Sequence, residues 1–325
     1  MTKHISCCKN KRVSKTCEGS SICNEDEVTL NQNRYLWGNV SSCDIELLIN
    51  DIYNKVVYWK KNVFKVPSGA SGKRYIREVT RLISSWTSDS PLKQIPIKAN
   101  MIMPSLLLQK PNKNSKAKDH AAVLERRLKF WNEGNLDELY HEANTIQQNL
   151  KFVLTKETVA NLSKRFGKLM ENGNINSALK LVTNNMTGGI LPLNDEITNK
   201  LIEKHPDPVR PKEEALLQGP IEKIHPIAFE EIDASLICRV SIKTKGGAGP
   251  SGMDADGWRR ILVSKTFGEC TEDLQKAIAN MTRKICSSNC NDDGSLDAFL
   301  ACRLVPLDKN PGVRPIGIGE VLRRI

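Results

Sequence analysis

Aromatic residues are scarce in this sequence: they are 5% of its 325 residues, and the mean hydropathy is -0.39. The 39% of hydrophobic residues can still build a core, but parts of the chain are expected to remain open. Long apolar runs are also missing. No stretch reaches the roughly 18 apolar residues of a membrane helix, and segment 1–23 lacks the apolar centre of a secretion signal. We therefore predict an intracellular protein, nuclear or cytoplasmic, with no membrane partner.

Paired cysteines at the spacing of zinc knuckles or ribbons are missing as well, although the chain has ten cysteines. An intracellular setting favours free thiols over disulfides. Zinc binding is the alternative interpretation, because two groups of potential ligands exist. These are His4, Cys7, Cys8, Cys17 and Cys23 near the start, and Cys286 with Cys290 further on. Neither group has a recognised ligand spacing, and we predict no metal site.

Segments that look like the motifs of common enzyme classes do not match those motifs at the required positions. Segment 69–74 reads G-A-S-G-K-R, but Pro67 and Arg74 stand where a phosphate-binding Walker loop needs Gly and Ser or Thr. Segment 247–252 matches G-x-G-x-x-G, yet Pro250 removes an N–H and no convincing strand precedes the loop, which argues against dinucleotide binding. No Ser-His-Asp or Cys-His arrangement is suggested either. We predict no catalytic residue in this chain.

Positive charge is what the sequence has in excess, and it is unevenly distributed. The formal net charge is +11. Residues 1–130 hold 23 Lys and Arg against 11 Asp and Glu, whereas residues 131–325 hold 25 against 26. A basic surface on the first 130 residues makes nucleic acid the leading candidate partner.

Apolar residues at three- and four-residue steps predict an amphipathic helix over 44–64 and a second one over 71–86. In the second helix the apolar residues share one arc and the cations fill the opposite arc. The candidate nucleic-acid-binding residues are these cations and two lysines near the end of the first helix: Lys60, Lys61, Lys73, Arg74, Arg77 and Arg81. Two interpretations remain open, namely contact with phosphates or a solvated helix face.

Composition divides the chain into five parts. Segment 1–33, rich in Cys, Ser and Lys and without periodicity, is predicted to be a disordered arm. Four prolines, at 91, 96, 104 and 111, are expected to interrupt the helices of the next part, and 110–118 has the composition of a polar basic linker. The five parts are the arm 1–33, a basic helical region 34–110, helical hairpins over 119–205, a Pro-rich linker 206–218 and a last region 219–325.

The predicted hairpins are marked by two similar turns. Segments 132–135 and 171–174 read N-E-G-N and E-N-G-N, and apolar helical patterns lie on both sides of each. Asn135 and Glu138 have the spacing of a capping box at the start of the helix after the first turn.

The last region carries the most specific pattern. Segment 301–325 reads ACRLVPLDKNPGVRPIGIGEVLRRI, which predicts a strand, a Pro-Gly turn, a second strand and a helix start. Upstream, a Gly-rich loop at 246–252 is followed by Met253-Asp254 and by a Trp-Arg-Arg run. These segments resemble the fingers of reverse transcriptases from retroelements of the non-LTR-like kind. Segments 59–68 and 106–128 look like the long amino-terminal extension of one group of such elements.

The resemblance implies a function. In the family, the Lys and Arg that match Lys309 and Arg314 contact the triphosphate of an incoming deoxynucleoside triphosphate, so these two are the candidate nucleotide-binding residues. An ordinary solvated turn is the alternative. The implied nucleic-acid partner is an RNA or DNA template-primer.

The family's metal-binding aspartates follow the fingers and have no counterpart here. Segment 291–294 reads N-D-D-G and is interpreted as a loop, and Asp254 and Asp256 as carboxylates at a helix start. We therefore expect a reverse-transcriptase fragment that is inactive alone. Magnesium is expected only for an intact relative.

The expected fold is mainly α, with helical hairpins in the amino-terminal two thirds and a small α+β hairpin at the carboxyl terminus. The apolar residues of that hairpin must find other cover or stay partly exposed, because a two-stranded hairpin is marginal alone: Leu304, Val305, Leu307, Ile316 and Ile318. The alternative function is a non-enzymatic, basic helical module that binds nucleic acid or another protein.

Overall fold

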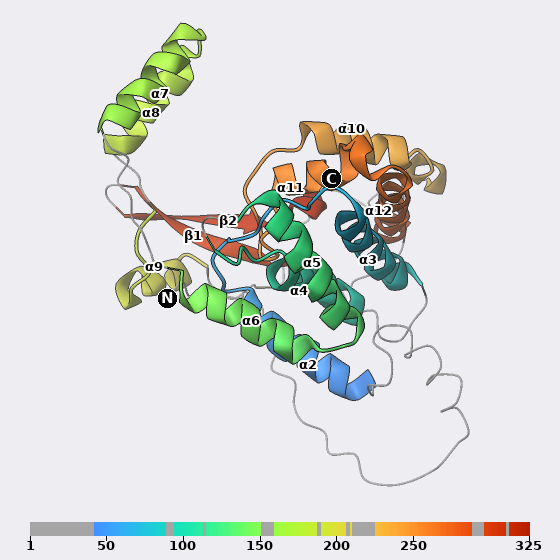
Figure 1. The fold of residues 1–325 in the computed structure, drawn as a ribbon. Coiled ribbons are helices and arrows are strands. Elements are labelled where there is room, and N and C mark those ends of the chain that lie inside the picture. Colours follow the sequence, from blue (N-terminus) through green and yellow to red (C-terminus); the bar gives the residue numbers. More distant parts are fainter. Residues whose placement is uncertain are drawn as a thin grey trace, which may run out of the picture.

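The computed structural model describes residues 42–88, 94–112, 115–150, 159–186, 190–205, 209, 225–287, 296–309 and 312–325. The described residues are mainly helical with one two-stranded antiparallel sheet, so the predicted fold class is confirmed (Figure 1). The α-helices are α2 (Ser42–Val56), α3 (Ala70–Thr87), α4 (Gln94–Leu107), α5 (Ala117–Asn132), α6 (Leu136–Gln148), α7 (Val159–Glu171), α8 (Ile175–Met186), α9 (Asp195–Glu203), α10 (Ala234–Lys243), α11 (Ala255–Val263), α12 (Glu269–Ser287) and α13 (Asp297–Leu300). The strands are β1 (Cys302–Asp308) and β2 (Val313–Gly319), and short 3-10 helices are η2 (Pro226–Phe229), η3 (Lys265–Phe267) and η4 (Val321–Arg324).

Several sequence predictions fall outside the described residues. They are the arm 1–33 with its His and Cys group, Cys290, the N-D-D-G segment 291–294, and the linker 206–218 apart from Val209. In the part of the chain that is described, no helix is both long enough and apolar enough to cross a membrane.

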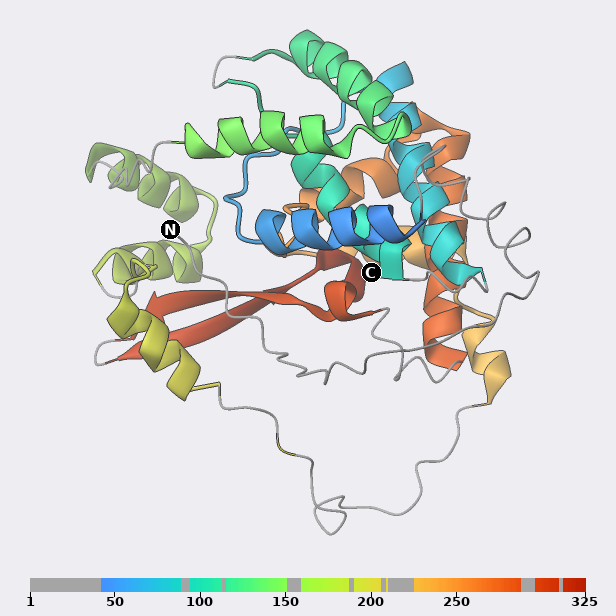
Figure 2. The ribbon, with the colours of Figure 1, turned by 90° about the horizontal axis from the view of Figure 1, so that it is seen from below.

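The helix predicted over 71–86 is confirmed as α3. Its apolar arc, which includes Tyr75, Ile83 and Trp86, is buried, because α12, α4 and α5 all pack against this helix. Figures 1 and 2 show α3 beside α12. The opposite arc, with the cations, stays at the surface, as amphipathic periodicity requires.

The helix predicted over 44–64 is too long, because α2 ends at Val56. Segment 61–66 is extended instead and pairs with the chain that leaves α4. The Phe64 N–H donates to the Leu108 carbonyl at 2.8 Å, and the Lys110 N–H donates to the Asn62 carbonyl at 2.9 Å. The backbone groups of this segment are therefore satisfied by hydrogen bonds to a distant part of the chain. In the predicted longer helix, they would have been satisfied by bonds within the helix.

The expectation that prolines break the chain between 91 and 111 is wrong for two of them, because Pro96 and Pro104 lie inside α4. Pro96 is in the first turn, where a backbone N–H has no helical acceptor to lose. Pro104 lies within a helix whose apolar residues are buried all round, and α4 contacts α2, α3, α5, α6 and α13. Burial on every side stabilises the helix despite the lost hydrogen bond.

The two predicted Gly-Asn turns are confirmed between α5 and α6 and between α7 and α8. Gly134 and Gly173 adopt φ angles of 78° and 71°, the left-handed conformation that favours glycine. The predicted capping box is wrong: Asn135 accepts no capping hydrogen bond, and its amide donates instead to Glu133. The hairpin of α7 and α8 stands to one side of the main body in both views (Figures 1 and 2), and the described part of α7 contains no buried residue.

The strands pair as predicted, with Val305 opposite Ile316 and Leu307 opposite Arg314. Leu304, Val305 and Ile316 are half-buried. Part of their cover comes from α9, whose Ile197 and Leu201 form a small apolar cluster with Val313. After β2 the chain turns at Glu320 into η4, which places Val321 and Leu322 in the main core.

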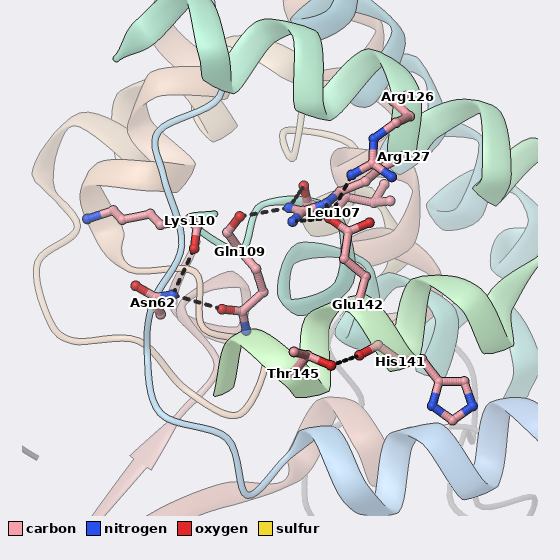
Figure 3. Close-up of polar contacts among 9 residues, drawn as sticks. All are labelled: Asn62, Leu107, Gln109, Lys110, Arg126, Arg127, His141, Glu142 and Thr145. Atoms are coloured by element: carbon pink, nitrogen blue, oxygen red, sulfur yellow. Dashed lines mark hydrogen bonds and ion pairs between the residues drawn. The ribbon is translucent and has the colours of Figure 1, made fainter. Parts of the chain in front are cut away.

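A buried arginine joins α4, α5 and α6 (Figure 3). Arg127 is 0% exposed, and one guanidinium nitrogen donates to the carbonyls of Leu107 and Gln109 at 3.0 and 2.7 Å. Its Nε and Nη2 donate to Glu142 at 3.0 and 2.8 Å, and Arg126 donates to the same carboxylate oxygen at 2.7 Å. Burial lowers the pKa of Arg127. Burial opposes ionisation of Glu142 too, but the two arginines outweigh it and lower the pKa of Glu142.

This cluster fixes the chain just after α4. Next to it, the Asn62 amide donates to the Gln109 side chain at 3.2 Å and to the Lys110 carbonyl at 3.3 Å (Figure 3). Together with the hydrogen bond from the Lys110 N–H to the Asn62 carbonyl, these contacts set the position of Lys110 relative to segment 61–66.

Candidate nucleic-acid interface

A hollow of about 870 Å³ lies where three distant segments of the chain meet: 61–68, 110–121 and 253–260. We call it the basic groove. Its cations are Lys61, Lys65, Lys110, Lys118 and Arg260, and its acids are Asp254 and Asp256. Five cations against two carboxylates give the groove a net positive potential, which suits an anionic ligand.

Two of the five cations are held by protein groups. Lys61 forms an ion pair with Asp254, which also accepts the Gly257 N–H at 2.8 Å as the N-cap of α11. Arg260 donates to the Val66 carbonyl at 2.5 Å and to Ser68 at 3.1 Å. Burial opposes ionisation of Asp254, but the Lys61 ammonium together with the Gly257 N–H outweighs it, and the pKa of that carboxyl is lowered. Asp254 is therefore a helix-start carboxylate, as predicted.

The other three cations are available to a ligand. Lys65, Lys110 and Lys118 are exposed, and no ion pair joins any of them to an acid within the described ranges. Lys65 stands between the buried Phe64 and Val66, so an extended backbone presents it on the solvent side. Three unpaired ammonium groups around one hollow form a charge arrangement that phosphate groups would neutralise.

An aromatic pair lines the same groove. The rings of His120 and Phe64 stack with centroids 4.4 Å apart and an interplanar angle of 7°. The His120 Nε2 and the Ser115 hydroxyl are 2.8 Å apart. Burial, and then the charge of Lys110, lower the pKa of His120, so the ring is neutral at neutral pH. The groove thus combines cations with a half-buried neutral ring.

A second hollow of about 290 Å³ adjoins the groove, because Asp254 and Asp256 line both. Its cations are Lys245 and Arg259. Arg259 is held by Asp256 at 2.6 Å and by the Thr244 carbonyl at 2.7 Å. Both carboxylates of the groove are therefore engaged by cations of the protein.

The predicted nucleic-acid-binding residues do not form one surface. Lys61 lies in the groove, whereas Lys60 is tied through its backbone to Gln147, at 3.0 and 2.9 Å.

On α3, the cations of the predicted stripe differ in their pairing. Arg74 pairs with Glu125, and Arg81 forms two contacts of 2.8 and 2.5 Å with Glu78. Lys73 and Arg77 have no acidic partner among the residues described here. The stripe is partly neutralised, so it has less free charge than the groove.

Sequence reasoning missed Lys65, Lys110, Lys118, His120 and Arg260 as site residues. The available signal was the run of lysines over 110–118, which has the composition of a linker. Segment 61–68 was assigned in part to a helix, which obscured the exposed position of Lys65. The convergence of three segments depends on tertiary contacts.

Lys309 and Arg314 lie on the strand hairpin and do not line the groove. Both are exposed. The Lys309 N–H donates to the Gly312 carbonyl at 3.0 Å, and Arg314 stands opposite Leu307. Because residues two apart on a strand share a face, Lys309 and Arg314 belong to the same face of the hairpin.

The two glycine-containing loops have structural explanations. A Cβ on Gly72 would lie 1.9 Å from the Pro67 carbonyl oxygen, so the start of α3 needs glycine for close packing. In the loop 246–252, Ser251 donates to the buried Glu320 through its N–H at 2.5 Å and its hydroxyl at 2.8 Å. The Gly-rich loop and the end of β2 are thus joined directly.

Glu320 predicts a specific pH dependence of stability. Burial raises its pKa above the ordinary value near 4.5, against the opposing effects of Ser251, Arg303 and Arg324. A raised pKa in the folded state means that the stabilising contribution is full below the unfolded pKa and is lost as pH rises through the folded pKa. We expect the unfolding free energy of the wild type, relative to Glu320→Gln, to fall as pH rises above about 4.5. Urea denaturation of both proteins across pH measures this, and a pH-independent difference would contradict it.

Metal ligands do not gather in the described part of the chain, where no group of three or more His, Cys, Asp or Glu side chains could hold an ion. Cys238, Cys270, Cys286 and Cys302 are free thiols. The carboxylates of the groove are engaged as described, so they do not fit a magnesium site.

Comparison of the chain with protein-family models, with curated proteins and with solved structures gives no match.

Proposed function

We propose that the chain is a nucleic-acid-binding region of a retroelement reverse transcriptase, comprising an amino-terminal extension and the start of the fingers. The observation that carries the proposal is the basic groove, where five cations surround one hollow and three of them have no acidic partner among the described residues. Electrostatic contact with phosphates supplies most sequence-independent affinity for nucleic acid. The ligand proposed for the groove is an RNA or DNA template-primer, which implies a nuclear or cytoplasmic setting.

The resemblance supports the same proposal. The Gly-rich loop and the hairpin, which carry the resemblance, contact one another through Ser251 and Glu320. Lys309 and Arg314 are proposed to hold the triphosphate of a deoxynucleoside triphosphate in an intact relative. Magnesium belongs to the chemistry of that relative, and no catalytic step is assigned to the residues of this chain.

A second candidate function is a protein-interaction module, and the hairpin of α7 and α8 favours it. Ile175, Leu179 and Val182 follow one another at helical spacing on α8 and are 54%, 56% and 41% exposed. Exposed apolar residues in a row on a helix are typical of a surface that another helix covers.

Changing the groove tests the main proposal. In a variant with Lys65, Lys110 and Lys118 all replaced by Gln, we expect weaker binding to a labelled oligonucleotide and a flatter dependence of log K on log salt. Each lost phosphate contact changes that slope by about 0.7–0.9, so three contacts change it by about 2–3. Fluorescence anisotropy at several salt concentrations measures the slope.

The matched control replaces three cations of the α3 stripe, Lys73, Arg74 and Arg77, by Gln. This variant loses the same formal charge and should keep the wild-type slope. A flattened slope in the control alone would move the interface from the groove to α3. No salt-dependent binding by the wild type would overturn the proposal.

A further inference from the structure

The lining of the basic groove is apolar as well as cationic. The apolar residues that line it are Val63, Phe64, Val66, Pro67 and Met253, and the first turns of α5 add Ala117 and Ala121. Phe64, Val66 and Met253 are almost fully buried, at 3%, 2% and 3% exposed, so the apolar surface open to a ligand comes mainly from Val63, Ala117 and Ala121, which are half-buried or exposed. A ligand that fills the hollow therefore meets ammonium groups and an apolar surface together.

A duplex and a single strand differ in what they can offer such a surface. A duplex presents phosphates outward and keeps its base faces stacked inside. A single strand presents phosphates and also unpaired bases whose flat faces stack on protein rings. A hollow of about 870 Å³ lies within the roughly 300–1,000 Å³ of small-molecule pockets, which suits a few linked nucleotides better than a double helix.

His120 is the group in the groove best placed to contact a base. It lines the hollow and is half-buried. The Phe64 ring supports one face, and the Ser115 hydroxyl lies 2.8 Å from Nε2, so the orientation of the ring is fixed before any ligand arrives. A pre-oriented ring loses little conformational freedom on binding, which favours affinity.

We propose that the basic groove is a single-strand site, in which an unpaired base stacks on His120 while neighbouring phosphates contact Lys65, Lys110 and Lys118. The inference rests on the proposed nucleic-acid function and adds to it the strandedness of the ligand and a base-contacting residue.

The experiment compares three probes of equal length on the full chain: a single-stranded oligonucleotide, its duplex, and a strand of abasic sites with the same phosphates. Anisotropy titrations at one salt concentration should show the base-containing single strand binding roughly tenfold more tightly than the abasic strand, the scale of one base–aromatic stack. The duplex should also bind more weakly than the single strand.

Two variants locate the contact. His120→Ala should remove most of the preference for bases over abasic sites without changing the salt slope, because the phosphate contacts remain. His120→Phe keeps a ring that can stack on Phe64 and should retain the preference. Thermal unfolding of both variants checks that they are folded, and the probe comparison on the wild type needs no variant at all.

The outcomes separate the two proposals. Equal affinity of the wild type for all three probes would overturn the single-strand inference and leave nucleic-acid binding standing. A preference for bases that survives His120→Ala unchanged would overturn the role of His120. If none of the probes bound, nucleic-acid function itself would be wrong.

Discussion

Replacing Arg127 by Ala is expected to lower the free energy of unfolding by about 3–5 kcal/mol, the range measured when one partner of a buried ion pair is removed. The guanidinium is fully buried and satisfies the carbonyls of Leu107 and Gln109 as well as Glu142. Without it, two backbone acceptors and a half-buried carboxylate lose a donor, and the packing of the side chain is lost as well. Urea denaturation followed by far-ultraviolet circular dichroism measures the change.

The neighbouring residue provides a matched control. Arg126 donates to the same oxygen of Glu142, but its side chain is 52% exposed. Arg126→Ala should therefore change stability by less than about 1 kcal/mol, as exposed ion pairs do. Similar losses in the two variants would show that the carboxylate, and not the burial of Arg127, determines the effect.

Losing Arg127 is also expected to change the geometry of the basic groove. Its two carbonyl contacts hold the chain between α4 and Lys110, and that chain pairs with segment 61–66. In a folded Arg127 variant, the backbone of 107–110 would lack these hydrogen bonds. Lys110 would then no longer be held in its wild-type position relative to Lys65. The stability of the cluster and the geometry of the candidate interface are thus properties of the same contacts.

Sequence periodicity predicted the elements that have one buried face. The α3 helix is the clearest case, because its apolar residues recur at helical spacing and are the ones buried where α4, α5 and α12 pack against the helix. The two turns with Gly134 and Gly173 were also predictable, since a left-handed residue between two amphipathic patterns has few alternatives to glycine. The strand hairpin was predictable from its alternating pattern around a Pro-Gly turn.

Periodicity failed where burial is complete or where pairing is tertiary. The α4 helix is buried on nearly every side, so it has no solvent-exposed polar face to reveal a helical period, and its two prolines suggested a break. The extended segment 61–66 has its hydrogen-bond partners more than forty residues away, beyond α4. Local pattern cannot indicate such pairing.

Of the candidate site, the sequence allowed only the positive charge to be predicted. An excess of cations in the first 130 residues indicated a basic surface, and Lys61 was among the residues named. The groove itself requires residues from 61–68, 110–121 and 253–260 to converge. Arg74 gave no sign in sequence that Glu125 of another helix would pair with it. The pair of Glu78 and Arg81, in contrast, has the i,i+3 spacing of neighbours on one helix and was open to prediction from the sequence. A charge pattern on one helix does not include the partners that other helices bring to it.

Replacing Gly249 by Ala is expected to lower the free energy of unfolding by about 1–3 kcal/mol, the usual effect of adding a group to a tightly packed position. A Cβ there would lie 2.8 Å from the backbone N and Cα of Glu320, and a main chain cannot move aside as the end of a flexible side chain can. The loop and the end of β2 must separate, which weakens the hydrogen bonds between Ser251 and Glu320. Urea denaturation measures the loss, and faster amide exchange at Ser251 reports the separation directly.

The same loop offers the control for that experiment. A Cβ on Gly247 would meet no atom within 4 Å, so Gly247→Ala should be neutral or stabilising by up to about 1 kcal/mol, because alanine restricts the unfolded chain more than glycine does. Equal losses in the two variants would mean that the whole loop needs the conformational freedom of glycine. A loss confined to Gly249→Ala, with faster exchange at Ser251, would mean that the close approach to Glu320 is what requires glycine. The two segments that carry the resemblance to reverse transcriptases would then be one packed unit.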